Sequence, residues 1–142
     1  MSIRAFDRAQ DAYNLAKKVA VQEKTIVFVL PRVQLGAFKT EIRFPWEGTI
    51  IDVYASAGTE GSGKTRIALE KCSEMDYVAV PNWINVLSSD IVFDANEKSI
   101  ITSSEPVVIG DAAVVKGDHF RINVVELGDG FQDLTVEVQV AI

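Results

Sequence analysis

The sequence has a single cysteine and a single histidine, and these two scarcities exclude several kinds of functional site. With Cys72 alone, no disulfide can form within the chain and no cluster of thiolates can hold a metal. Because His119 is the only imidazole, a histidine-based metal site is excluded, and a Ser–His pair could be built only on that residue. The neighbours of His119, KGDHFRINV, predict the start of a strand, so we expect a plain surface or edge histidine.

The chain also lacks long apolar runs and an excess of basic charge. Apolar stretches such as residues 26–30 are far too short to span a bilayer, and residues 1–10 carry charges where a signal peptide needs an apolar segment. Fourteen Lys and Arg residues stand against twenty Asp and Glu residues, which gives a net charge of −6. A nucleic-acid-binding surface needs a basic stripe that displaces counterions, so we expect neither a nucleic-acid partner nor a membrane partner.

Residues 1–23 contain neither glycine nor proline and are rich in residues that favour helices. They predict one N-terminal α-helix over residues 3–23, with Ser2 as its N-cap. We therefore expect an N-terminal arm (1–23) ahead of a single domain (24–142). Residues 1–24 hold five Lys or Arg and three Asp or Glu, so a mildly basic arm precedes an acidic body.

The predicted helix has one apolar face, whose side chains recur at steps of three and four residues: Phe6, Ala9, Tyr13, Ala16 and Ala20. A helix of this length is marginal in water unless that face is covered. It can pack on the chain's own body, on sister helices or on another protein. The small side chains of Ala9 and Ala16 suit a close approach of helices, which favours the face as a surface for oligomerisation or partner docking.

From Lys24 onward the apolar pattern changes to a period of two. Residues 134–142 alternate most regularly, and residues 119–125 repeat the pattern. Short strand candidates rich in Val, Ile, Phe and Thr follow one another between turn sequences such as PWEG and LGDG, without helical patterns of useful length between them. This organisation predicts a mainly β protein, an antiparallel β-sandwich or barrel, preceded by the N-terminal helix.

Residues 58–65 spell G-x-x-x-x-G-K-T, the pattern of a phosphate-binding loop. In such a loop Lys64 would reach the outer phosphates, Thr65 would ligate magnesium and Asp94 would supply the second acidic group. That loop needs a parallel sheet with crossover helices, which the remaining sequence does not offer. In the alternative interpretation the segment is a hairpin loop, in which Gly58, Gly61 and Gly63 permit positive φ angles.

Two further groups of residues were weighed as ligand sites. Four aspartates, Asp111, Asp118, Asp129 and Asp133, lack the regular spacing of a calcium loop and are expected to be solvated turn residues. Four aromatic residues, Trp46, Tyr54, Tyr77 and Trp83, could stack on sugars, although core packing is the simpler expectation. Residues 77–87 include an apolar stretch that is either a contact patch on a loop or part of the core.

Two segments of the chain resemble conserved-looking blocks of small structural proteins of tailed-phage virions. Residues 44–72 match a block of strand and turn residues, and residues 114–140 match the usual ending, with K-G-D, an alternating strand, a glycine turn and DLTV. The matching positions of the first block are Pro45, Gly48, Thr49, Ile50, Val53, Ala55, Ser56, Gly58, Thr59, Gly61 or Gly63, Leu69 and Lys71. Residues 73–90 depart from the pattern, because this insert is longer and more aromatic.

The resemblance implies a jelly-roll-like β-sandwich that is found in head-associated or tail-associated proteins. Such proteins are commonly homotrimers, and an N-terminal segment docks them onto the particle. The expectation is a non-enzymatic virion component without a cofactor or metal, serving as capsid decoration, head-fibre base or tail adaptor, with other virion proteins as partners. The alternatives are a carbohydrate-binding module for host attachment and, less favoured, a nucleotide-binding protein that uses residues 58–65.

Overall fold

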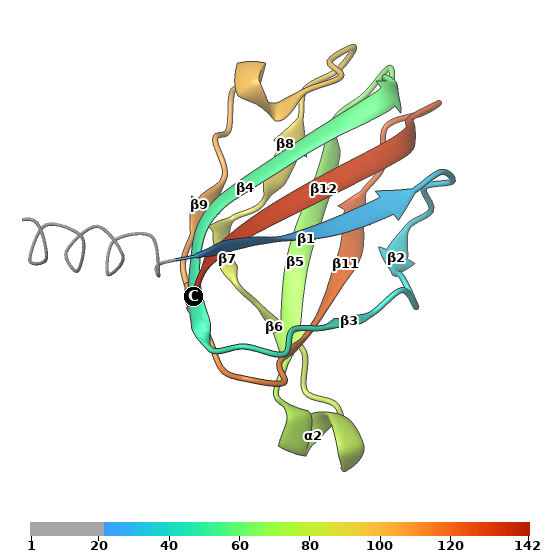
Figure 1. The fold of residues 1–142 in the computed structure, drawn as a ribbon. Helices are drawn as coiled ribbons and strands as arrows, with labels where there is room; N and C mark the ends of the chain where they lie inside the picture. The colour runs from blue at the N-terminus through green and yellow to red at the C-terminus, as the bar shows by residue number, and fades with distance from the viewer. Residues whose placement is uncertain (1–21) are drawn as a thin grey trace, which may run out of the picture.

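The computed structural model of the protein describes residues 22–142, which form a body of antiparallel strands (Figure 1). Within this part of the chain, the helical structure is limited to α2 (Glu74–Val78) and the short 3-10 helix η1 (Ile100–Thr102). The prediction of a mainly β protein with antiparallel sheets is therefore confirmed.

One sheet, called the first sheet here, has four strands that all pair antiparallel in the order β1-β12-β4-β10. Its strands are β1 (Glu23–Leu30), β12 (Gln132–Ala141), β4 (Gly48–Thr59) and β10 (Ala113–Val114). The long strand β12 lies between β1 and β4, so the last strand of the body joins two of its early strands.

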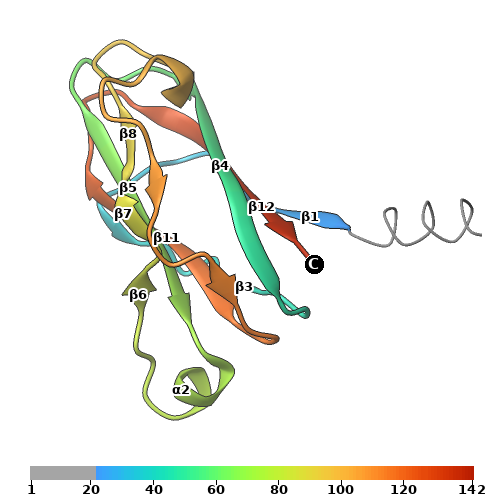
Figure 2. The same ribbon diagram turned by 90° about the vertical axis from the view of Figure 1, so that its left-hand side faces the viewer.

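The second sheet runs in the order β2-β11-β5-β6, with β3 also paired to β11 and β8 also paired to β5. Its strands are β2 (Gly36–Ala37), β3 (Ile42–Arg43), β5 (Thr65–Cys72), β6 (Ile84–Asn85), β8 (Ile91–Phe93) and β11 (His119–Glu126). A separate two-stranded ribbon joins β7 (Leu87–Ser89) to β9 (Val108–Ile109). Viewed from the side, β4 and β12 form one layer and β5 and β11 another, with α2 beyond the end of the second layer (Figure 2).

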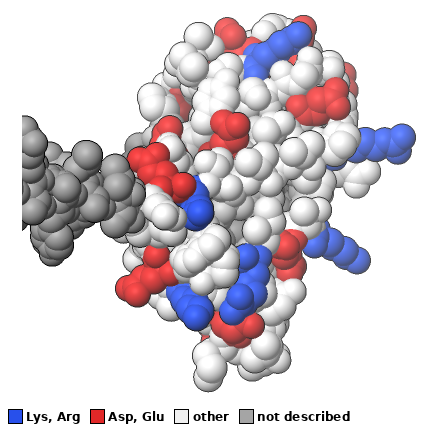
Figure 3. Space-filling model, in the orientation of Figure 1, with Lys and Arg blue, Asp and Glu red and all other residues white. Residues whose placement is uncertain are grey.

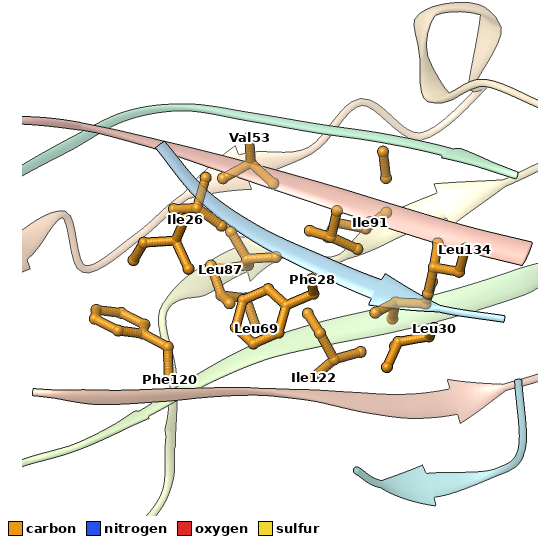
Figure 4. Close-up of a cluster of buried hydrophobic side chains, with 14 of the residues drawn as sticks. Ile26, Phe28, Leu30, Val53, Leu69, Leu87, Ile91, Phe120, Ile122 and Leu134 are labelled. Atoms are coloured by element: carbon orange, nitrogen blue, oxygen red, sulfur yellow. The ribbon is translucent and has the colours of Figure 1, made fainter. Parts of the chain in front are cut away.

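The core lies between the two sheets, and side chains from both meet in it (Figure 4). The expected alternation is confirmed on β12, where the inward side chains Leu134, Val136, Val138 and Val140 are fully buried. Phe120, Ile122 and Val124 of β11 are buried in the same way. Full burial of an aliphatic or aromatic side chain of this size stabilises a fold by about 1.5–3 kcal/mol, so these alternating strands provide much of the driving force for folding.

The structure gives no support to the N-terminal helix predicted over residues 3–23. Residues 1–21, which include the face formed by Phe6, Ala9, Tyr13, Ala16 and Ala20, lie outside the described residues. Glu23, the predicted last residue of the helix, is instead the first residue of β1 and pairs with Ala141. The prediction is wrong for Glu23, which favours a helix locally, because its pairing with β12 decides its conformation.

Candidate functional site

Residues 60–64, within the phosphate-loop motif, connect β4 of the first sheet to β5 of the second sheet (Figure 1). The expectation of a hairpin loop is therefore wrong, because these two strands do not pair with each other. β4 ends at Thr59, and β5 begins at Thr65 without a helix between or after them. A phosphate-binding loop depends on a following helix, whose N-terminal N–H groups point at the phosphates. The apolar residues of segment 65–72 fit both helical and strand spacing, and in the structure the segment is a strand paired with β11. The motif therefore lacks the frame that phosphate binding requires.

The glycines of this loop serve close packing and do not provide positive φ angles. In the described part of the chain, the glycines with positive φ are Gly36, Gly117 and Gly130, so the expectation for Gly58, Gly61 and Gly63 is wrong. The loop instead crosses residues 127–130, where a Cβ added to Gly128 would overlap the carbonyl oxygen of Gly63. Ser62 N–H also donates to the carbonyl of Asp129 at 2.9 Å.

The three side chains that would handle a nucleotide each have a structural partner. Thr65 is fully buried, and its Oγ1 accepts a hydrogen bond from Gly128 N–H at 2.9 Å. The Lys64 ammonium lies 2.5 Å from a Glu105 carboxylate oxygen, an ion pair that raises the pKa of Lys64. Asp94 accepts hydrogen bonds from the backbone N–H and the hydroxyl of Ser104, which lower its carboxyl pKa.

A network of polar and aromatic side chains fastens α2 to the second sheet. His119 is 7% exposed, and its ring stacks on that of Tyr77 with a centroid separation of 3.7 Å and an angle of 7°. Its Nε2 lies 2.8 Å from Glu74, and Arg43 Nε donates to the same carboxylate oxygen at 2.9 Å. The expectation of a plain surface or edge histidine is therefore wrong, because no sequence pattern indicates that α2 packs against this end of β11.

Two pKa values in this network are shifted by its hydrogen bonds. The Arg43 guanidinium, followed by the His119 ring, holds the pKa of the Glu74 carboxyl below its usual value. The Tyr77 hydroxyl donates to Glu41 at 2.6 Å, and this hydrogen bond to a carboxylate raises the pKa of the phenol. Near neutral pH the Glu74 carboxylate is therefore charged and the Tyr77 phenol is protonated, as the hydrogen bonds that hold α2 require.

The chain that follows α2 is held by a second set of contacts. The Arg121 guanidinium lies 4.2 Å from the ring centroid of Trp83, and Tyr77 meets the same indole edge to face at 6.3 Å. Arg121 Nε also donates to Glu70 at 2.7 Å, so its guanidinium is fixed from both sides. These contacts position residues 73–85 as a defined protrusion at the end of the body (Figure 2).

The same protrusion exposes four large apolar side chains, which we call the tip patch: Met75, Val78, Val80 and Ile84. Three of them are more than 70% exposed, and Ile84 is 48% exposed. The stretch 77–87 is thus divided between surface and core, since Val86 and Leu87 are buried. Isolated exposed apolar residues are ordinary, but several within ten residues on one protrusion are typical of a contact surface.

The outer face of the first sheet has a shallow polar hollow of about 180 Å³. It is lined by side chains from three neighbouring strands: Thr25, Asp52, Tyr54, Glu137 and Gln139. Figure 3 looks onto this side of the molecule, and acidic groups are scattered over it. An open hollow with carboxylates, an amide, a hydroxyl and one aromatic ring suits a small polar ligand that has several hydroxyl groups.

The four aromatic residues considered for sugar stacking do not form one platform. Tyr77 and Trp83 contact each other beside α2, whereas Trp46 packs edge to face on Phe44 and lies under the ammonium of Lys24. Tyr54 lies on the outer face of the first sheet with its hydroxyl 3.1 Å from Ser99 Oγ. The expectation of core packing is also wrong for all four, since the buried aromatic rings are those of phenylalanines.

No group of three His, Cys, Asp or Glu side chains suited to a metal ion occurs within residues 22–142. Among the four aspartates considered for calcium, Asp118 is buried and accepts a hydrogen bond from Val115 N–H, and Asp111 pairs with Lys71 at 3.0 Å. In the same part of the chain, none of the helices has the length and apolar character needed to cross a membrane.

Sequence reasoning missed the two features that are most specific to this structure. The stack of Tyr77 on His119 joins residues 42 positions apart, and the loop crossing joins Gly63 to Gly128. Only the pairing of β5 with β11 brings these pairs together, and no periodic pattern signals it. Comparisons of the chain with protein families, with curated proteins and with solved structures find no match.

Proposed function

We propose that the protein is a non-enzymatic structural component of a bacteriophage virion, which acts by forming homo-oligomers, most simply trimers, and by docking onto other virion proteins. The observation that carries the proposal is the tip patch, a set of apolar side chains that a firmly held protrusion presents to solvent. Such a surface is typical of a protein that works through contacts with other chains.

The arrangement of the two virion-like blocks supports the proposal. Residues 44–72 contain β4 and β5, and residues 114–140 contain β11 and β12. β4 pairs with β12 and β5 pairs with β11, so each block contributes a strand to both sheets. The glycine-containing turns of the two blocks are also the ones that cross at Gly63 and Gly128. We therefore regard the two blocks as one structural unit, and propose that the body is a jelly-roll-like sandwich.

In this proposal the arm (1–23) joins the chain to its partners, and the body is the displayed part. The basic residues of the arm would be attracted to acidic protein surfaces, and the acidic body would keep the unassembled protein dispersed. Assembly needs no cofactor. The final location would be the virion, after assembly in the host cytoplasm.

The test is the oligomeric state of the full chain and of a double variant, Phe6→Asp with Tyr13→Asp, measured by light scattering after size exclusion. We expect the unchanged protein to form an oligomer, most simply of three chains, and the variant to be a single chain that no longer attaches to particles. The double change Gln10→Asp with Asn14→Asp is the control, because it adds the same charge outside the apolar face. A double variant of Phe6 and Tyr13 that keeps both properties would refute the proposed role of the arm.

A second candidate function, carbohydrate binding for host attachment, is favoured by the polar hollow on the first sheet. Tyr54 supplies a ring that can stack on a sugar, and Asp52, Glu137 and Gln139 supply acceptors and donors for its hydroxyl groups. A glycan array probed with the full chain tests it, with Tyr54→Ala as the binding-deficient variant and Trp46→Ala as the control. Silence of the array towards the unchanged protein would remove this candidate.

A further inference from the structure

We propose that the tip patch is the docking site for the N-terminal arm, residues 1–21, of a neighbouring copy of the chain. The inference rests on the proposed role of the arm in assembly and names the surface that receives it. The tip patch comprises the side chains of Met75, Val78, Val80 and Ile84.

The tip patch is an addition to the fold and not a part of its core. Met75, Val78 and Val80 are 79%, 73% and 79% exposed, so burial of these side chains contributes little to the stability of the body. In Figure 3 the lowest part of the molecule, where α2 lies in Figure 1, ends in uncharged atoms. Covering these side chains would remove apolar surface from water, which favours association with a partner that has an apolar face.

The protrusion is held rigidly, as a docking surface requires. Ser73 caps α2 by accepting a hydrogen bond from Asp76 N–H at 3.1 Å, and Glu74 ties the first turn to both Arg43 and His119. The ring of Tyr77 stacks on His119 behind the helix. Because these contacts order the backbone before a partner arrives, binding carries a smaller entropic penalty than it would for a mobile loop.

Charge complementarity points to the arm as the occupant. The first turn of α2, beside the tip patch, carries the carboxylates of Glu74 and Asp76. Glu74 is paired with Arg43, whereas Asp76 has no ion pair within residues 22–142. The arm, over residues 1–21, contains four basic and two acidic residues: Arg4, Arg8, Lys17, Lys18, Asp7 and Asp11. Opposite charges around an apolar contact speed association and fix its orientation, and they discourage the acidic body from binding the acidic tip.

The apolar pattern of the arm also suits the patch. Its sequence places large side chains at Phe6 and Tyr13, seven residues apart, with small alanines between them. An amphipathic segment of this kind binds to an apolar surface through anchors spaced by whole turns, and aromatic anchors contribute most to such interfaces. The tip patch, in turn, offers a Met and three β-branched residues, which adapt to and pack against aromatic rings.

The root of the arm lies beside the C-terminal end of β12, and a series of contacts leads from it towards the tip (Figure 1). Gln22 accepts a hydrogen bond from Ile142 N–H, and the next residues lead to Lys24, whose ammonium lies 5.1 Å from the ring centroid of Trp46. Trp46 in turn packs on Phe44, which follows Arg43, the partner of α2. An arm that leaves this end and binds the tip of the next copy makes a head-to-tail contact, which closes into a ring when it is repeated about a rotation axis.

The experiment uses three full-length proteins. The patch variant carries Met75→Ser, Val78→Ser and Val80→Ser, and the arm variant carries Phe6→Asp and Tyr13→Asp. The control variant carries Val29→Ser, Ile101→Ser and Val125→Ser, which remove apolar surface at sites that are also exposed but lie away from the tip. Each protein is measured alone by light scattering after size exclusion, and the arm and patch variants are then measured as an equimolar mixture.

We expect the control variant to keep the oligomeric mass of the unchanged protein, and the patch variant and the arm variant each to fall to the mass of one chain. Loss of the apolar anchors should raise the dissociation constant by about 30-fold or more. The mixture should form a dimer, because it restores one intact arm facing one intact patch but cannot close a ring.

Other results overturn the inference in distinguishable ways. If the arm variant dissociates while the patch variant keeps the oligomeric mass, the proposed function survives and the tip is not the docking site. If the mixture stays monomeric, docking between copies is refuted. If the unchanged protein is itself a single chain, both proposals fail.

A charge-reversed variant, Asp76→Lys, gives an independent measurement without loss of apolar surface. It should weaken the oligomer several-fold at low salt, and the difference from the unchanged protein should shrink as salt is added. An Asp76→Lys oligomer as tight as that of the unchanged protein at low salt would contradict the proposed charge complementarity.

Discussion

Thr65 provides the sharpest distinction between a phosphate-binding loop and a packed loop that connects the two sheets. In a nucleotide site its hydroxyl would ligate magnesium, and replacing it would abolish binding without loss of stability. In this structure the hydroxyl is fully buried and accepts the only hydrogen bond recorded for Gly128 N–H among the described residues, at 2.9 Å. The substitution Thr65→Val keeps the shape of the side chain and removes that acceptor.

The expected loss of stability follows from the burial of the donor. Gly128 is buried, so its N–H cannot turn to water when the hydroxyl is gone, and an unsatisfied buried donor costs about 1–3 kcal/mol. The added methyl group must also fit at hydrogen-bond distance from the nitrogen, which pushes the cost toward the upper part of that range. Thr65→Ser retains the hydroxyl and loses one buried methyl group, so we expect about 1 kcal/mol.

Urea denaturation followed by tryptophan fluorescence measures this difference. With a denaturant slope of about 1–3 kcal/mol per molar urea, Thr65→Val should lower the midpoint by about 1 M and Thr65→Ser by less. Thr59→Val, at the other end of the same loop but exposed, is the control and should change the free energy of unfolding by less than about 0.5 kcal/mol. A Thr65→Val protein as stable as the Thr59→Val control would refute a stabilising role for the buried hydrogen bond between Gly128 N–H and the Thr65 hydroxyl.

Three other predictions follow from the same contacts. Gly128→Ala should destabilise the body more than Gly63→Ala destabilises it, because a Cβ at Gly128 would overlap the carbonyl oxygen of Gly63, whereas a Cβ at Gly63 would make only an ordinary contact; thermal unfolding of both variants tests this, and equal melting temperatures would contradict it. Magnesium–ATP should not raise the melting temperature of the unchanged protein, and Lys64→Ala should leave the denaturation midpoint nearly unchanged because its ion pair with Glu105 is partly exposed; saturable nucleotide binding that Lys64→Ala abolishes would revive the phosphate loop. The pKa of Glu74 is lower in the folded than in the unfolded protein, so its contribution to stability is present above about pH 4.5 and is lost as the pH falls through the folded value. Between pH 5 and pH 3 the unchanged protein should therefore lose more stability than Glu74→Gln, and parallel curves in urea denaturation would show that the contacts of Glu74 with Arg43 and His119 do not stabilise the fold.

Much of the body could be predicted from short-range pattern. The alternation in residues 134–142 and 119–125 gave two strands and their inward faces correctly, because burial of every second side chain is a property of each strand by itself. The phosphate-loop motif was correctly interpreted as a loop between two strands, since the surrounding sequence had no crossover helices. The expected hairpin was wrong, because the two strands belong to different sheets. The prediction of positive φ angles for the glycines of the motif was wrong, because these glycines pack against a second loop about 65 residues away in the sequence.

The candidate surfaces were less accessible to sequence reasoning. The stretch 77–87 looked like core because it is apolar, but whether an apolar residue is covered depends on which elements lie over it, and nothing in the described structure covers Val78 or Val80. His119 looked like an edge residue because its partners Tyr77 and Glu74 come from a helix of five residues, too short to show a period.

The sequence by itself determined that the protein is mainly β, where its longest strands alternate, and that one cysteine and one histidine leave few possibilities for metal chemistry. The tertiary structure alone decided which strands pair, that the Thr65 hydroxyl joins two loops by a hydrogen bond to Gly128, and that the apolar residues around α2 face solvent. The physical reason is the sequence separation between the residues that contact each other. Alternation records the local preference of each segment for a buried side, whereas loop crossings, ring stacks and exposed patches depend on contacts between segments far apart in the chain, which no local pattern encodes.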